Sequence, residues 1–465
     1  MAMGFPVLAD FQSGAFYPPH LLFFILPFFA AIRIIFVLHF LIAMVGSYKL
    51  LRYWSYPCYL SILGALLFTL GGTLVSLSNL LNHFQTAVWL PWVLLFWEEA
   101  IRAGSWKRFV ALVLILAVQF LAGSPELFAL SLVIVVIDGF RIKTSEPDIP
   151  YGRIILIFVC ANFLVVGLTM VQLLPTAELF LESRRVQPIP LQETLQWSLQ
   201  PQGLLNLFFL DKEVDSSASV GIRFFFAKEA AFFVSYYLGA ISIFGICLWL
   251  CSGPLRKKIS ALLLIAVSLI FALGHYTPVY PFLLHHSPML GAMRFPEKFF
   301  YVTYVLLIYI ALNGIAEFID RDKQNSKKAM LVLSIVCVAL VGTYLYIRWD
   351  FNLVAHFIAE KTGIHPASAE NSKMVASVLA SLERQIILSL ALLVLFALVK
   401  FEKIRQSLFA FLLVSTTFVD LAWAHRDYLF PINPDFTRSS ARILHEPDHK
   451  PTRVFYYPSG GNLHP

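Results

Sequence analysis

Long runs of apolar residues recur along the chain and are separated by short polar stretches. Because a bilayer core of about 30 Å needs about 20 apolar residues in a helix, each run predicts a membrane-spanning helix. The runs cover residues 31–50, 57–78, 85–101, 107–122, 125–139, 154–174, 231–251, 259–275, 298–318, 329–347, 385–400 and 407–425. The pattern therefore predicts an all-α, polytopic transmembrane protein with about 12 spans.

A shorter apolar piece, Leu21 to Phe29, precedes the first of these runs. Pro18, Pro19 and Pro27 interrupt it, and proline breaks a continuous helix because it lacks an amide hydrogen. We expect a short interfacial or re-entrant segment here, outside the regular spans.

Composition agrees with a membrane protein. Hydrophobic residues make up 58% of the chain and charged residues 14%, against roughly 45–50% and about 25% in soluble domains. These values exclude a soluble enzyme, a disordered chain and a secreted disulfide scaffold. The 5 cysteines form no CxxC pair and lie in or beside apolar runs, which indicates packing residues and not a zinc site.

Basic residues mark one side of the predicted membrane domain. They concentrate in the loops 47–56, 102–108, 140–153, 252–258, 319–328 and 400–406, whereas the turns 79–84 and 122–126 hold none. Cytoplasmic loops carry an excess of lysine and arginine, so we assign the basic loops to the cytoplasm. The net charge of +7 therefore reflects membrane orientation, and we expect no nucleic acid partner.

This orientation defines the domains. Residues 1–425 form the transmembrane domain, and its extracytoplasmic loops cover 1–30, 175–229, 276–297 and 348–384. An extracytoplasmic tail, 426–465, includes a β-like run from Thr452 to Tyr457 that ends shortly afterwards. We interpret the tail as the start of a truncated domain. An extracytoplasmic N-terminus without a signal peptide indicates a missing upstream helix, so we expect an internal fragment of a longer reading frame.

The predicted spans carry few charged side chains, which cost at least about 2.5–3.5 kcal/mol each at the centre of a membrane helix. Arg33 and Asp420 are the main exceptions, each near the outer end of its span. We expect neither to form an ion pair in the middle of the membrane. Polar residues instead gather at the extracytoplasmic ends of the helices, in five clusters.

The first cluster lies in the loop from Gly4 to Pro19, which includes Asp10, Gln12 and Tyr17. A carboxylate there would accept a proton from an acceptor hydroxyl, although a turn or helix cap explains the same residues.

The second cluster places His83 between polar residues and a tryptophan-rich stretch. Asn79, Asn82 and Gln85 surround it, and Trp89 follows. These side chains suit hydrogen bonding to sugar hydroxyls and stacking on sugar faces. An interfacial turn with a tryptophan belt is the alternative.

The third and fourth clusters add carboxylates and arginines. Glu126 follows a Gly-Ser-Pro turn and is also well placed at a helix N-terminus, where a negative charge is favourable. Glu178 precedes the pair Arg184 and Arg185. Paired guanidinium groups suit a phosphate, and pairing with Glu178 and Glu182 is the alternative.

The fifth cluster, Arg294, Glu297 and Lys298, comes directly before a predicted span. It suits a grip on a lipid phosphate, or simple anchoring at the interface. Three nearby histidines show no metal-like spacing: His275, His285 and His286. We assign no metal-binding residues. The identity of any cofactor stays open, because the sequence shows no clear ligand set for a divalent metal.

Six segments in this order resemble the YfhO-type bacterial membrane proteins: GFPVLADFQSGAFYPP, AVWLPW, AGSPE, QLLPTAELFLESRR, MRFPEKFF and VDLAWAHRDY. The similarity runs over essentially the whole chain, and the ordered series is more specific than any one motif. Members of that family usually begin with one more transmembrane helix and an acidic loop, and they continue beyond the β-like run.

The family resembles GT-C glycosyltransferases, so the resemblance implies a GT-C-like fold in the bacterial cytoplasmic membrane with both termini extracytoplasmic. It also implies transfer of a sugar from a polyprenyl-phosphate donor to a cell-envelope acceptor. Asp10 matches a family acidic position and would be the catalytic carboxylate. Because the upstream acidic loop is missing, the chain as given is expected to be inactive alone.

Two other functions fit the same sequence. A lipid or polysaccharide transporter, such as a flippase, would show broken helices and charges inside the membrane, and Gly71-Gly72 interrupts the second predicted span. An inactive fragment of such an enzyme would have no pocket near Asp10.

Overall fold

The structure is a computed structural model that describes residues 6–182, 190–207, 232–254, 256, 258–286, 294–320, 323–362 and 365–426. Every regular element in these residues is a helix. The predicted all-α class is therefore confirmed for the described part of the chain.

The N-terminal half begins with the short helices η1 (Phe11–Ser13), η2 (Pro18–Leu21) and α1 (Leu22–Ile25). The longer helices that follow are α2 (Phe28–Tyr53), α3 (Cys58–Leu70), α4 (Gly72–Leu77), α5 (Leu81–Ala87), α6 (Leu90–Ala103), α7 (Trp106–Leu121), α8 (Pro125–Ser145), α9 (Tyr151–Leu168) and α10 (Met170–Glu182).

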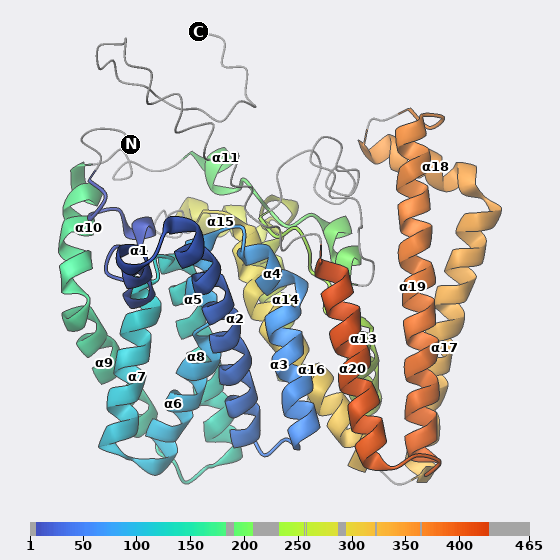
Figure 1. Cartoon of the computed structure of the whole chain (residues 1–465), viewed down its shortest axis with the longest axis horizontal. Helices are drawn as coiled ribbons and strands as arrows, with labels where there is room; N and C mark the ends of the chain where they lie inside the picture. Colours follow the sequence, from blue (N-terminus) through green and yellow to red (C-terminus); the bar gives the residue numbers. More distant parts are fainter. Residues whose placement is uncertain are drawn as a thin grey trace.

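The C-terminal half contains α11 (Leu191–Thr194), η4 (Pro201–Leu207), α13 (Ala240–Cys251), α14 (Ile259–Ala272), η6 (Gly274–Tyr276), α15 (Val279–His286) and η8 (Pro296–Phe299). It ends with α16 (Phe300–Asp320), α17 (Lys323–Trp349), α18 (Phe351–Thr362), α19 (Ala369–Lys400) and α20 (Gln406–His425). The longer helices run side by side from the upper to the lower edge of Figure 1.

In the described part of the chain, seven helices are long and apolar enough to cross a membrane, which indicates a multi-pass membrane protein. They are Phe28–Tyr53, Cys58–Leu77, Tyr151–Leu168, Pro296–Asp320, Lys327–Trp349, Asn371–Lys400 and Gln406–His425. Ala240–Cys251 and Ile259–Ala272 are apolar but shorter. The count of about 12 spans stays a prediction.

The predicted short segment before the first span is present. Pro18–Leu21 and Leu22–Ile25 form two short helices, and Pro27 then caps the start of α2. The proline spacing therefore marked a real helix boundary.

The second predicted span is interrupted between α3 and α4. Gly71 is extended, with φ −67° and ψ 149°, and the amide of Gly72 donates to the carbonyl of Tyr237 at 2.7 Å. A side chain at Gly72 would come within 2.8 Å of the Ser235 backbone. The glycine pair thus lets a second chain segment approach the helix axis.

That second segment corrects the prediction of a helical span over 231–251. The helix α13 begins only at Ala240, and residues 232–239 form no helix. Gly239 has φ +82°, where glycine is favoured. Phe233, Tyr236 and Tyr237 are almost fully buried, so an apolar stretch that the sequence could not distinguish from a helix is a buried segment without regular structure.

The predicted extracytoplasmic loop 348–384 is largely helical, because α18 and the first half of α19 lie within it. Ser368 caps α19 by accepting from the amide of Asn371. Ile347, Ile358 and Leu382 belong to a small apolar cluster of their own. The helices α17, α18 and α19 thus form a hairpin that extends past the neighbouring helices at the upper edge (Figure 1).

Helix ends that flank five of the six basic loops lie at one end of the molecule (Figure 1). The ends of α2, α6, α8, α16 and α19 all reach the lower edge in Figure 1, and we call this the basic end. Glu98, fully buried there, pairs with Arg141 and with Arg102 at 3.1 Å. The pair with Arg141 joins α6 to α8.

Candidate functional site

Four segments that are far apart in the sequence meet at the end of the molecule opposite the basic end. Since α6 ends at the basic end and α7 returns, the Gly123 turn and the start of α8 lie at this opposite end. The segments are the first loop, residues 79–89, the turn 123–126 and residues 294–298. Four of the five predicted clusters therefore contribute to one region.

The turn at Gly123 organises the meeting point. Its φ of +99° favours glycine, and a Cβ there would lie 3.0 Å from the carbonyl oxygen of Phe11. The Asn82 amide donates to the Gly123 carbonyl at 3.0 Å, and Thr86 accepts from the Ser124 amide at 3.2 Å. These contacts fix the start of α8 against α5 and the first loop.

Lys298 is the central charge of this region. Its ammonium lies 3.0 Å from the carboxylate of Glu126, and the Lys298 side chain is only 3% exposed. The ammonium also lies over the rings of Phe232 at 5.4 Å and Phe295 at 4.9 Å. We call these residues, together with His83, the Lys298 site.

His83 completes the Lys298 site from α5. It is 7% exposed, and its ring meets the ring of Phe232 edge to face at 5.4 Å. Burial, the largest cause, and the Lys298 charge together lower the pKa of His83 to about 4, although Glu126 acts in the opposite direction. The imidazole is therefore neutral at pH 7.

Aromatic side chains enclose the Lys298 site. Trp197 contacts Phe295 with ring centroids 4.4 Å apart and Phe232 at 5.9 Å. Phe295 itself has a left-handed backbone, φ +69°, a conformation that costs on the order of 1–3 kcal/mol for such a residue. Its amide donates to the carbonyl of Thr194 at 3.2 Å, which helps to hold the ring in place.

The carboxylate oxygens of Glu297 bind the chain itself. They accept from the amides of Phe232 and Phe233 at 3.2 Å each, and from the hydroxyl of Tyr236. Glu297 is 2% exposed. This predicted substrate-binding residue thus holds the segment 232–236.

The first loop is close to the Lys298 site but its side chains have other partners. Asp10 accepts from the amide of Gln12 at 3.1 Å and so caps η1. Gln12 is exposed. Tyr17 is 1% exposed, and its hydroxyl binds His39 at 2.6 Å and accepts from Trp89 at 2.8 Å.

The remaining predicted residues are more scattered. Arg294 is half-buried, and its guanidinium lies 5.2 Å from the Phe295 ring centre. Glu178 is exposed on α10, while Thr176 on the same helix donates to the carbonyl of Ala9 at 2.9 Å. Arg184 and Arg185 lie outside the described residues, as does the predicted tail from residue 427 onward.

Sequence reasoning missed the aromatic part of the Lys298 site. Phe232 was assigned to a membrane span, and Phe295 and Trp197 were not singled out. The sequence signal was Phe295, directly after Arg294, but an apolar residue just before a predicted span is also typical of simple anchoring at the interface.

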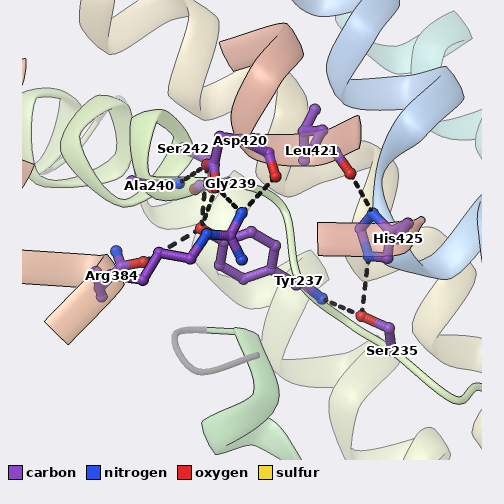
Figure 2. A network of polar contacts seen from close by, with 10 residues as sticks. Ser235, Tyr237, Gly239, Ala240, Ser242, Arg384, Asp420, Leu421 and His425 are labelled. Atoms are coloured by element: carbon purple, nitrogen blue, oxygen red, sulfur yellow. Dashed lines mark hydrogen bonds and ion pairs between the residues drawn. The ribbon is translucent and has the colours of Figure 1, made fainter. Parts of the chain in front are cut away.

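A second polar network lies inside the helix bundle, between α13, α19 and α20 (Figure 2). Asp420 is 3% exposed and accepts from Arg384 at 2.5 Å, from the Tyr237 hydroxyl at 3.0 Å and from the Ala240 amide at 2.9 Å. Asp420 lies near the C-terminal end of α20, so the expectation that it forms no ion pair in the middle of the membrane stays a prediction. Arg384 fell in a predicted loop, which concealed the pair.

The same network reaches the interrupted helix α3–α4. His425 binds the hydroxyl of Ser235 at 3.1 Å, and Ser76 accepts from the Ser235 amide at 2.9 Å. Since segment 232–239 carries both Phe232 and Tyr237, it joins this network to the Lys298 site. We call the residues drawn in Figure 2 the Asp420 network.

A cavity of about 930 Å³ lies elsewhere, on the α17–α19 hairpin, and none of the predicted site residues lines it. Among the described residues, no group of three or more His, Cys, Asp or Glu side chains could hold a metal ion.

Comparison with known proteins adds no relative: no protein-family model, no curated protein and no solved structure matches the chain.

Proposed function

We propose that this chain is the membrane domain of a glycosyltransferase of the YfhO type, which moves a sugar from a polyprenyl-phosphate donor to a cell-envelope acceptor. The observation that carries the proposal is the Lys298 site, a buried ammonium beside a carboxylate, a neutral imidazole and aromatic rings, at the end opposite the basic loops. In the proposed orientation this end faces away from the cytoplasm.

The cations of the site suit a phosphate. An ammonium has three donors, and only one of the Lys298 donors has a partner among the described residues, Glu126. Arg294 acts electrostatically on Lys298, so the two charges are close. Two cations placed where negative charge develops on a departing phosphate would stabilise the transition state.

The remaining groups suit a sugar and its acceptor. Asp10 and Gln12 border the Gly123 turn, and Trp197 offers a flat apolar face at the site. Carbohydrate rings carry hydroxyls on their edges and apolar faces, which match polar side chains and aromatic rings. The exposed apolar faces of the helices would hold the polyprenyl chain. The sugar and the acceptor stay open.

The test is sugar transfer by the full-length protein in vesicles, supplied with a polyprenyl-phosphate sugar. Lys298→Met should lower the rate by about 10²-fold or more, the effect of removing a group that stabilises transition-state charge. Lys107→Met, an exposed lysine at the basic end, is the matched control and should transfer at the wild-type rate. An unchanged rate in Lys298→Met contradicts the assignment of Lys298.

The orientation can be tested separately. A topology reporter fused after Arg294 should report the extracytoplasmic side, and one fused after Gly104 the cytoplasmic side. A cytoplasmic Arg294 would overturn the proposed reaction, because the polyprenyl donor would then be presented on the opposite face.

A lipid or polysaccharide transporter is the second candidate, and two observations favour it. The helix α3–α4 is interrupted, and the ion pair of Arg384 with Asp420 lies within the helix bundle. Interrupted helices and intramembrane charges are typical of transporters. Movement of a labelled lipid across vesicles by wild-type protein, lost in Asp420→Asn and retained in Lys298→Met, would support this candidate against the enzyme.

A further inference from the structure

His83 has one nitrogen with a partner and one without. Its Nδ1 lies 2.9 Å from Oδ1 of Asn82. Its Nε2 is buried and has no hydrogen-bond partner among the described residues. Buried polar atoms are usually paired, so this nitrogen is an exception that needs an explanation.

The neighbouring contacts fix which nitrogen carries the hydrogen. The Gly123 carbonyl can only accept, so the Asn82 amide nitrogen must face it, as the 3.0 Å contact shows. The Asn82 oxygen then faces His83 and can only accept. Nδ1 of His83 is therefore the donor, and because the ring is neutral, Nε2 carries a free lone pair.

The surroundings of this lone pair favour a ligand with a hydroxyl group. The charged groups that act on the ring are Lys298 and Glu126, and the ammonium of Lys298 is hydrogen-bonded to Glu126. The ring of Phe232 covers the imidazole from the edge. A buried acceptor without a donor costs free energy, which an incoming O–H group would recover.

We propose that Nε2 of His83 accepts the proton of the acceptor hydroxyl during sugar transfer, and that the acceptor is therefore an alcohol. The proposal rests on the proposed function. In the step, the O–H bond breaks and its proton moves to Nε2, while the oxygen bonds to the anomeric carbon. The bond from that carbon to the phosphate oxygen breaks, and its electron pair stays on the phosphate.

The charges of the Lys298 site are consistent with this role. Lys298 opposes protonation of His83, and Glu126 favours it. A phosphate bound at Lys298 would offset the ammonium charge, so donor binding should raise the pKa of His83 toward the working pH, where a general base is most effective. Asp10, the acidic candidate from the sequence, is already used as the cap of η1.

The first experiment measures which nitrogen of His83 carries the hydrogen, and it does not depend on sugar transfer. In the full-length protein, labelled with ¹⁵N-histidine and placed in lipid nanodiscs, the resonance lost in His83→Gln identifies His83. At pH 7 it should show a protonated Nδ1 and a bare Nε2. Asn82→Ala should mix the two tautomers. A proton on Nε2, or a charged ring, would overturn the proposal.

The second experiment measures kcat/KM for sugar transfer against pH. His83→Gln should lower kcat/KM by about 10²–10⁴-fold, the usual contribution of a general base, and should abolish the acid limb of the profile. Asp10→Asn should keep that limb. His20→Gln is the control, because His20 lies in the same region and binds Gln85 at 2.9 Å; it should leave the limb unchanged.

The outcomes separate the two levels of the proposal. If wild type transfers sugar and His83→Gln keeps both the rate and the acid limb, the role of His83 is wrong while the proposed function stands. If wild type transfers no sugar from any polyprenyl-phosphate donor offered, the proposed function fails, and the proton-transfer role fails with it.

Discussion

Arg384 of α19 and Asp420 of α20 form an ion pair inside the helix bundle, with 2.5 Å between the guanidinium and the carboxylate (Figure 2). Asp420 also accepts from the first amide of α13. A single carboxylate thus links the α17–α19 hairpin, the last helix and the helix that follows segment 232–239.

Removal of one partner of this pair should be costly. Arg384→Met leaves the Asp420 carboxylate buried without its cation, and breaking a buried pair in this way costs about 3–5 kcal/mol. We expect a marked drop in the thermal unfolding temperature in detergent. The double variant Arg384→Met/Asp420→Leu should regain part of that loss, because no charge is then left unpaired. A loss in the double variant equal to the sum of the losses in Arg384→Met and Asp420→Leu would contradict the coupling of the two side chains.

The close approach at Gly72 gives a second prediction. Gly72→Ala would place a methyl group 2.8 Å from the Ser235 backbone, so segment 232–239 would have to move. We expect destabilisation of about 1–3 kcal/mol, as for overpacking of a buried site. Gly167→Ala is the matched control, because nothing lies within 4 Å of that position in α9. The measurement is the thermal unfolding temperature of both variants, and equal temperatures would argue against a tight contact at Gly72.

Glu297 should act as a structural residue for segment 232–236. Glu297→Ala leaves the amides of Phe232 and Phe233 without acceptors, and each unsatisfied buried group costs about 1–3 kcal/mol. Hydrogen–deuterium exchange of a peptide covering residues 232–236 should become faster. The exposed Glu178→Ala variant should show wild-type exchange. Unchanged exchange in Glu297→Ala would indicate that the segment is held in another way.

The burial of His83 predicts a pH dependence of stability. Its folded pKa of about 4 lies below the unperturbed value of about 6.5, so its contribution is complete above pH 6.5 and is lost as the pH falls toward 4. By linkage, the loss at pH 5 is about 2 kcal/mol. His83→Gln should reduce the drop in unfolding temperature between pH 7.5 and pH 5. An identical drop in the two proteins would contradict a buried neutral ring.

Several features of this protein follow from the sequence alone. Apolar runs of sufficient length favour helices, because backbone groups in hydrocarbon need partners within their own segment. Proline and glycine marked the start of α2 and the break after Gly71. Glu126 and Lys298, placed at helix ends in two separate clusters, were identified from residue type and position.

Only the tertiary structure decided how these parts combine. A buried helix and a buried irregular segment have the same apolar composition. Residues 232–239 could therefore be recognised as non-helical only from their contacts with distant partners such as Gly72 and Glu297. Arg384 and Asp420 lie 36 positions apart, and a pair of that separation depends on how two helices pack. Phe232 reached Lys298 and His83 for the same reason: local sequence sets which residues a helix end carries, whereas contacts across the bundle set which of them meet.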